Sequence, residues 1–120
     1  MTIIDELLGH AGQWAASFEP AASTPRPSRK VAVVSCMDSR IDVFAILGLR
    51  LNEAHVIRNA GGIVTDDVVR SLVLSQRLLG TEAVLLMHHT DCGMVSTTEE
   101  EFAERMEREA GVRPPWTAGF

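Results

Sequence analysis

The sequence is short of basic residues and of long apolar runs, and each shortage excludes a class of protein. Its 11 Lys and Arg are scattered among 16 Asp and Glu, and the formal net charge is −5. This argues against a nucleic-acid partner, because binding phosphates requires clustered basic side chains. The apolar runs fall far short of the roughly 20 residues that span a bilayer, so we expect no membrane partner.

Cysteine is also scarce, and tyrosine is missing altogether: the sequence contains two Cys and no Tyr. The first residues lack the basic segment of a signal peptide, so we expect a cytoplasmic protein. In that setting two cysteines are interpreted first as thiols or metal ligands, not as a disulfide.

The chain of 120 residues is long enough for one domain. Apolar residues at helical spacing predict an amphipathic helix over residues 5–18. Three prolines in residues 20–30 predict an arm that holds this helix away from the rest and leaves it free to pack on another subunit. We therefore divide domain 1–120 into an N-terminal helix and arm (1–30), an α/β core (31–112) and a tail (113–120).

The core alternates strand and helix patterns, which indicates a small parallel β-sheet flanked by helices. Short apolar runs predict three strands, at residues 31–35, 54–58 and 83–87. Helical segments are expected at residues 41–49, after the N-cap Thr65 as far as Gly80, and from Thr98 to a stop at Gly111. The fold class is α/β with an N-terminal helical arm.

Cys36 follows the first predicted strand, and His89 and Cys92 follow the third. The carboxyl ends of parallel strands share one edge of a sheet, so these side chains are expected to meet there. Two thiolates and an imidazole suit zinc and leave a fourth position open, as in catalytic sites. Two unrelated buried thiols, a cytosolic disulfide, or a structural site completed by a partner chain remain as alternatives. Weaker claims belong to the other histidines, namely His10, His55 and His88.

Asp38 and Arg40 extend this site. A carboxylate two residues from a ligand can reach the metal or hydrogen-bond to whatever fills its open position, and Arg40 can hold it with two hydrogen bonds. A solvated ion pair is the alternative. Gly61 and Gly62 would let the backbone approach a small substrate, although an ordinary turn explains them equally well. Arg58 is left unassigned.

Three motifs together resemble the β-class carbonic anhydrases, and in particular their smaller archaeal- and actinobacterial-like branch. They are Cys36-Met37-Asp38-Ser39-Arg40, Arg58-Asn59-Ala60-Gly61-Gly62 and His89-Thr90-Asp91-Cys92-Gly93-Met94.

The resemblance implies a zinc lyase that hydrates carbon dioxide reversibly to bicarbonate and a proton. One Zn²⁺ per chain would be bound by Cys36, His89 and Cys92, with Asp38 and Arg40 as the catalytic dyad and Gly61 and Gly62 in the substrate pocket. Asp38 is expected to become a fourth zinc ligand in a closed state at low pH. A homodimer or higher homo-oligomer is also implied.

Two departures from the family pattern carry predictions. One subgroup binds inhibitory bicarbonate with a Trp where this chain has Val33, with the Arg of the second motif, here Arg58, and with a Tyr. Arg58 is present without these partners, so we predict no such site here. Family members usually continue further, so we expect the usual C-terminal segment, a sheet edge and part of the dimer surface to be missing. Two other functions stay open. One is a carbonyl sulfide or carbon disulfide hydrolase with the same metal site, and the other is an inactive, truncated zinc-binding domain.

Overall fold

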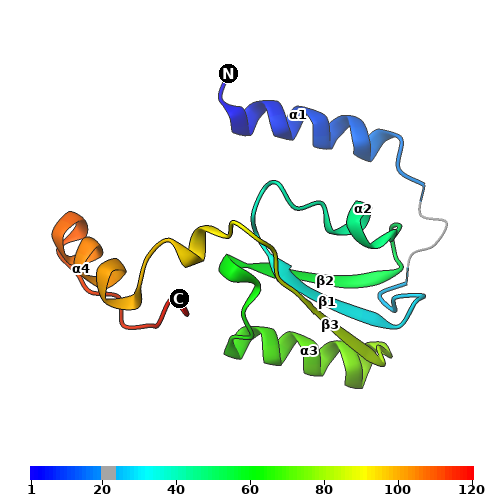
Figure 1. Ribbon diagram of the computed structural model, residues 1–120. Coiled ribbons are helices and arrows are strands. Elements are labelled where there is room, and N and C mark those ends of the chain that lie inside the picture. Colours follow the sequence, from blue (N-terminus) through cyan, green and yellow to red (C-terminus); the bar gives the residue numbers. More distant parts are fainter. Residues whose placement is uncertain (20–23) are drawn as a thin grey trace.

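A parallel sheet of three strands lies at the centre of the computed structural model, which describes residues 1–19 and 24–120 (Figure 1). The strands are β1 (Val31–Cys36), β2 (Ala54–Asn59) and β3 (Ala83–Met87), in the order β2-β1-β3. Both pairings are parallel, and Ser35 of β1 lies opposite Arg58 of β2 and Met87 of β3. The α/β class and the parallel sheet predicted from the sequence are confirmed.

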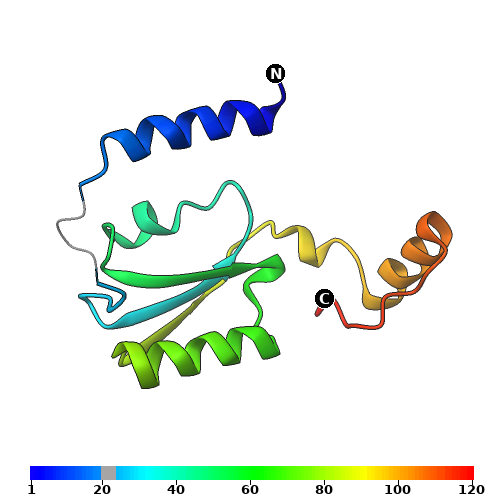
Figure 2. The same cartoon turned by 180° about the vertical axis from the view of Figure 1, so that it is seen from behind.

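The central strand carries most of the core. Residues 32–36 are all buried, as expected for an apolar run with a partner on each side. Helix α2 (Val43–Leu47) covers one face of the sheet and helix α3 (Asp66–Leu79) the other (Figures 1 and 2). Each contributes a buried valine, Val43 and Val68.

The helix ends follow local chemistry. Thr65 caps α3 by accepting a hydrogen bond from the Val68 N–H, and Gly80 ends it in the left-handed region, as predicted. The segment expected at residues 41–49 is shorter than predicted, because the Asp42 side chain caps the start of α2 and Gly48, with φ of 64°, ends it.

Helix α4 (Glu99–Ala110) and the C-terminal residues lie beyond the carboxyl ends of the strands (Figures 1 and 2). The Glu99 carboxylate accepts hydrogen bonds from the backbone N–H groups of Ala118, Gly119 and Phe120. The Phe102 ring packs against the rings of Trp116 and Phe120. The tail is therefore fastened to the first turn of α4.

Helix α1 (Ile3–Ala16) buries none of its residues and lies apart from the sheet in both views (Figures 1 and 2). It begins two residues before the predicted start, because Thr2 and Asp5 form a capping box. The first part of the predicted arm, residues 20–23, lies outside the described residues. The remainder is joined to the body, since Ser28 and Arg29 donate backbone hydrogen bonds to the carbonyls of Asn52 and Glu53. Within the described ranges, no helix is long and apolar enough to cross a membrane.

Candidate metal centre

Cys36, His89 and Cys92 meet at the carboxyl edge of the sheet. Cys36 was expected just after the first strand, but β1 is one residue longer than predicted and Cys36 is its last residue. His89 and Cys92 lie in the loop that follows β3. Because β1 and β3 are in register up to Ser35 and Met87, that loop emerges beside Cys36. The potential ligand atoms of the three residues all lie within 4.8 Å of one another.

The spacing of these atoms fits zinc. The sulfur atoms of Cys36 and Cys92 are 3.8 Å apart; two thiolates at about 2.3 Å from a tetrahedral zinc ion are separated by about that distance. Nε2 of His89 is buried and has no hydrogen-bond partner among the described residues. Its Nδ1 donates to the Thr90 carbonyl at 2.8 Å, which leaves the lone pair on Nε2 for a metal.

The protonation of the cluster also suits metal binding. Burial would raise the pKa of the Cys36 thiol, but the His89 imidazole and the backbone N–H groups of Asp38 and Gly61 lower that pKa to about 7. The neighbouring Cys36 sulfur raises the pKa of His89, so the metal-free Cys36–His89 pair retains a proton that metal binding would release. A thiolate, the form that binds metals, is thus accessible near neutral pH.

Asp38 and Arg40 form the close pair that their spacing suggested. Nη2 of Arg40 lies 2.6 Å from Oδ2 of Asp38, and Nε lies 3.0 Å from Oδ1. The side-chain hydrogen bonds from Arg40, followed by its backbone N–H, lower the pKa of the Asp38 carboxyl. Nη2 of Arg40 also donates to the Asp91 carbonyl at 2.9 Å, so Arg40 joins the segment that follows Cys36 to the loop that carries His89 and Cys92.

A cavity of about 260 Å³ opens beside the cluster. It is lined by Cys36, Met37, Asp38, Ala60, Gly61, Cys92, Gly93 and Met94. Gly61 therefore lines the cavity that adjoins the three potential ligands. Gly62 lies behind the site: a Cβ atom there would come within 2.9 Å of the Cys36 backbone nitrogen.

A second cavity, of about 180 Å³, adjoins His89 and Cys92 on another side and is lined in part by His88, Gly119 and Phe120. The approach of the tail to this cavity could not be read from the sequence, because the tail is placed by the contacts of Glu99 with backbone amides. Nε2 of His88 donates to the Gly62 carbonyl at 3.2 Å.

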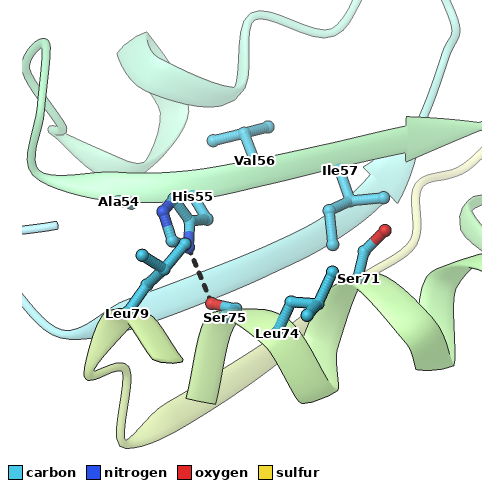
Figure 3. Close-up of a pocket in the computed structure, with 8 residues that line it drawn as sticks. All are labelled: Ala54, His55, Val56, Ile57, Ser71, Leu74, Ser75 and Leu79. Atoms are coloured by element: carbon cyan, nitrogen blue, oxygen red, sulfur yellow. Dashed lines mark hydrogen bonds between the residues drawn. The ribbon is translucent and has the colours of Figure 1, made fainter. Parts of the chain in front are cut away.

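His55 belongs to a separate, structural network. Its Nδ1 lies 2.7 Å from the Ser75 hydroxyl, which lies 2.8 Å from the Thr81 hydroxyl, and its Nε2 donates to the Pro25 carbonyl. Figure 3 shows His55 pointing from β2 toward α3, at a cavity of about 400 Å³ between these two elements. The cavity shares no lining residue with the metal centre.

Two features of the site were not predicted from the sequence. One is the backbone carbonyl of Asp91, which accepts a hydrogen bond from Arg40; a motif of side chains does not reveal such a contact. Arg58, left unassigned above, directs its guanidinium to the backbone carbonyls of Cys36 and Asp38. The signal that could have located it is its position opposite Ser35 at the end of the neighbouring strand.

Comparison with known proteins gives consistent matches. The family model described as carbonic anhydrase matches residues 31–117. Beta-carbonic anhydrase 1 of Mycobacterium tuberculosis is 50% identical over 117 residues, which is 98% of this chain and 71% of that protein. The carbon disulfide hydrolase of Saccharolobus solfataricus is 46% identical over 76 residues, covering 63% of this chain and 37% of that protein. The crystal structure of a carbonic anhydrase from Streptococcus mutans matches with a TM-score of 0.87 and 43% identity, over 94% of this chain and 68% of that chain.

Proposed function

The chain belongs to the β-class carbonic anhydrase family, and on that premise we propose that it catalyses the reversible hydration of carbon dioxide to bicarbonate and a proton. The observation that carries this proposal is the cluster of Cys36, His89 and Cys92. Nε2 of His89, which is buried and has no hydrogen-bond partner in the described part of the chain, lies beside two sulfur atoms 3.8 Å apart. We propose that these residues hold one zinc ion per chain. Zinc bound there would supply the Lewis acid that makes water a nucleophile near neutral pH.

We propose that Asp38 orients the attacking water. Its carboxylate lines the cavity beside the cluster, and its lowered pKa keeps it ionised at neutral pH. An ionised carboxylate only accepts hydrogen bonds, so it would fix the direction of a water proton. Because its pKa lies so far below neutrality, orientation is a better role for it than proton removal. Arg40 would keep the carboxylate charged and in place.

The cavity beside the cluster suits a small uncharged substrate. Apart from Asp38, its lining consists of cysteine, methionine, alanine and glycine, which offer carbon dioxide an apolar surface. Gly61 has no side chain to fill the space, and we propose that it lines the substrate pocket. Gly62 would act indirectly, by allowing the backbone to pass close behind Cys36.

We further propose that Asp38 can become a fourth zinc ligand at low pH, where competition from hydroxide falls. In the structure the carboxylate is bonded to Arg40 instead, with Oδ2 3.9 Å from Nε2 of His89. On this proposal the observed arrangement would be the open state, and closure would require the carboxylate to leave Arg40.

We propose a homodimer or higher homo-oligomer, assembled in part through α1. The apolar side chains of this helix, among them Leu7, Leu8 and Trp14, are more than half exposed. A second copy of the chain is the occupant that such a detached amphipathic helix fits best.

A second candidate is hydrolysis of carbon disulfide or carbonyl sulfide. It is favoured by the carbon disulfide hydrolase that is 46% identical to part of this chain. The same metal ligands would serve both reactions, so the access and width of the cavity would decide between them.

Stopped-flow measurement of carbon dioxide hydration, on protein of known zinc content at pH 8 and above, separates these functions. Hydration supports the main proposal. Release of sulfide from carbonyl sulfide or carbon disulfide, without carbon dioxide hydration, supports the second candidate. A zinc-loaded protein that turns over none of these substrates would be a zinc-binding domain without this activity.

A further inference from the structure

The side chain of Arg58 grips the backbone of the segment that carries the first metal ligand. Arg58 lies opposite Ser35, near the end of β2. Its Nε donates to the Cys36 carbonyl at 2.8 Å, and its Nη2 donates to the Asp38 carbonyl, also at 2.8 Å. One planar guanidinium thus spans two acceptors on either side of Met37.

Other bonds hold the same segment, and they show what Arg58 adds. The Met37 N–H donates to the Asn59 carbonyl at 2.7 Å, which continues the β1–β2 pairing by one residue. The Ile41 N–H donates to the Asp38 carbonyl at 3.0 Å and closes the following turn. Between these two points the chain leaves the sheet. There, Arg58 connects it to β2 with hydrogen bonds from a charged donor, which are stronger than neutral ones.

The two residues whose carbonyls accept these bonds, Cys36 and Asp38, are those whose relative position matters for the proposed reaction. Cys36 is a proposed zinc ligand, and Asp38 is the proposed orienting carboxylate. Arg40 holds the side chain of Asp38 and donates to the Asp91 carbonyl in the loop after β3, but it belongs to the same segment and makes no bond to β2 among the described residues. Arg58 comes from a different strand and can anchor the segment to it.

We propose that Arg58 is a positioning residue: its guanidinium fixes the backbone from Cys36 to Asp38, so that the Cys36 sulfur and the Asp38 carboxylate face the same cavity. This inference rests on the proposed function for its kinetic consequence, but not for its structural one. It also gives Arg58 a role other than binding an anion, because Nε and Nη2 already donate to carbonyl oxygens.

The test compares Arg58→Gln and Arg58→Lys with wild type and with Arg70→Gln, all as purified zinc-loaded protein. Arg70 makes a surface pair with Asp67, at 3.7 Å, and serves as the matched control. Amide hydrogen exchange is measured by NMR at Met37, Arg40 and Ile41, whose N–H groups are all bonded within or next to the segment. Val33 and Val34 in β1 report on the fold as a whole. Hydration kinetics are measured on the same samples.

We expect Arg58→Gln to speed exchange at Met37, Arg40 and Ile41 by about 10-fold or more, the effect of losing charge-assisted hydrogen bonds. Exchange at Val33 and Val34 should stay within about 2-fold of wild type, since the sheet itself is intact. The kcat should fall by about 10- to 100-fold, because a misplacement of about 1 Å in a catalytic group has effects of this size. The exchange rates and the kcat of Arg58→Lys should lie between those of wild type and Arg58→Gln, because one ammonium group cannot span both carbonyls. Arg70→Gln should match wild type.

Unchanged exchange in the segment in Arg58→Gln, or an equal rise at Val33 and Val34, would overturn the proposal. So would equal kcat in wild type and Arg58→Gln when wild type is active. If wild type hydrates no carbon dioxide, the proposed function fails, but the exchange data still decide whether Arg58 holds the segment. Bicarbonate that slows wild type and no longer slows Arg58→Gln would indicate an anion site instead, and would also overturn the proposal.

Discussion

Oδ2 of Asp38 lies 3.9 Å from Nε2 of His89, yet the carboxylate is bound to Arg40, whose Nη2 is 2.6 Å away. A carboxylate so close to a proposed zinc ligand could reach the metal by a small movement. The Arg40 guanidinium opposes that movement, since it holds both carboxylate oxygens and is itself tied to the Asp91 carbonyl. If zinc binds as proposed, the Asp38–Arg40 pair would determine whether its fourth position is open.

Removing Arg40 should close the site. In Arg40→Gln, Asp38 loses its partner, so we expect it to bind the zinc at neutral pH and carbon dioxide hydration to fall by about 100-fold, the upper range for loss of a residue that orients a metal site. Zinc-edge X-ray absorption should show an additional oxygen ligand from the protein. Wild type should show the same change at low pH only. The control is Arg105→Gln, which removes a surface pair with Glu109 on α4. Identical zinc coordination in wild type from acid to alkaline pH would contradict the closure.

Replacing a thiol ligand should remove the metal. Losing a residue that only hydrogen-bonds to a metal ligand weakens metal binding by about 10- to 100-fold. In Cys92→Ser the loss of zinc affinity should be larger, because the soft thiolate ligand itself is replaced by an alcohol. Metal analysis after dialysis against a chelator measures this directly. His10→Asn, on the detached helix α1, should retain as much zinc as wild type. Full zinc retention by Cys92→Ser would mean that this cysteine is not a ligand.

The Asp38–Arg40 pair should also leave a signature in the pH dependence of stability. Hydrogen bonds from Arg40 hold the folded pKa of Asp38 below its ordinary value of 3.8. The ionised carboxylate thus stabilises the fold above that pH, and this contribution is lost as the pH falls through the folded pKa. In metal-free protein, Asp38→Asn should be less stable than wild type at about pH 7, and the difference should shrink below about pH 4.

Urea unfolding at both pH values measures this difference, and Asp67→Asn is the control, since that carboxylate is exposed and 3.7 Å from its arginine. A difference between Asp38→Asn and wild type that does not change with pH would show that the pair contributes nothing through ionisation.

The sequence predicted those parts of the structure that depend on local chemistry. The caps at Thr65, Gly80, Thr98 and Gly111 follow from side-chain and backbone preferences over a few residues, and all four are present. The meeting of Cys36 with His89 and Cys92 follows from the geometry of parallel strands, so it could be predicted before any coordinates were known.

What the sequence did not predict involves backbone atoms that are distant along the chain. Arg58 and Arg40 both donate to backbone carbonyl oxygens. Every residue has such a carbonyl, so the sequence does not indicate which one accepts the bond. The contacts of Glu99 with the tail are of the same kind. The sequence predicts Glu99 only as an acidic residue in the first turn of a helix, whereas its bonds to the backbone amides of Ala118 and Phe120 depend on how the tail folds back.

The buried hydroxyl of Ser75 should contribute measurably to stability. It lies 2.7 Å from Nδ1 of His55 (Figure 3) and 2.8 Å from the Thr81 hydroxyl. Ser75→Ala therefore takes one hydrogen-bond partner from each. Leaving buried polar groups without a partner costs about 1–3 kcal/mol, and we expect the free energy of unfolding to fall by that amount. Ser71, one turn earlier on α3 and lining the same cavity, is the matched control. Because both substitutions change helix propensity equally, the difference between Ser75→Ala and Ser71→Ala in urea unfolding isolates the hydrogen bonds. Equal stability of the two variants would mean that this network does not stabilise the contact between β2 and α3.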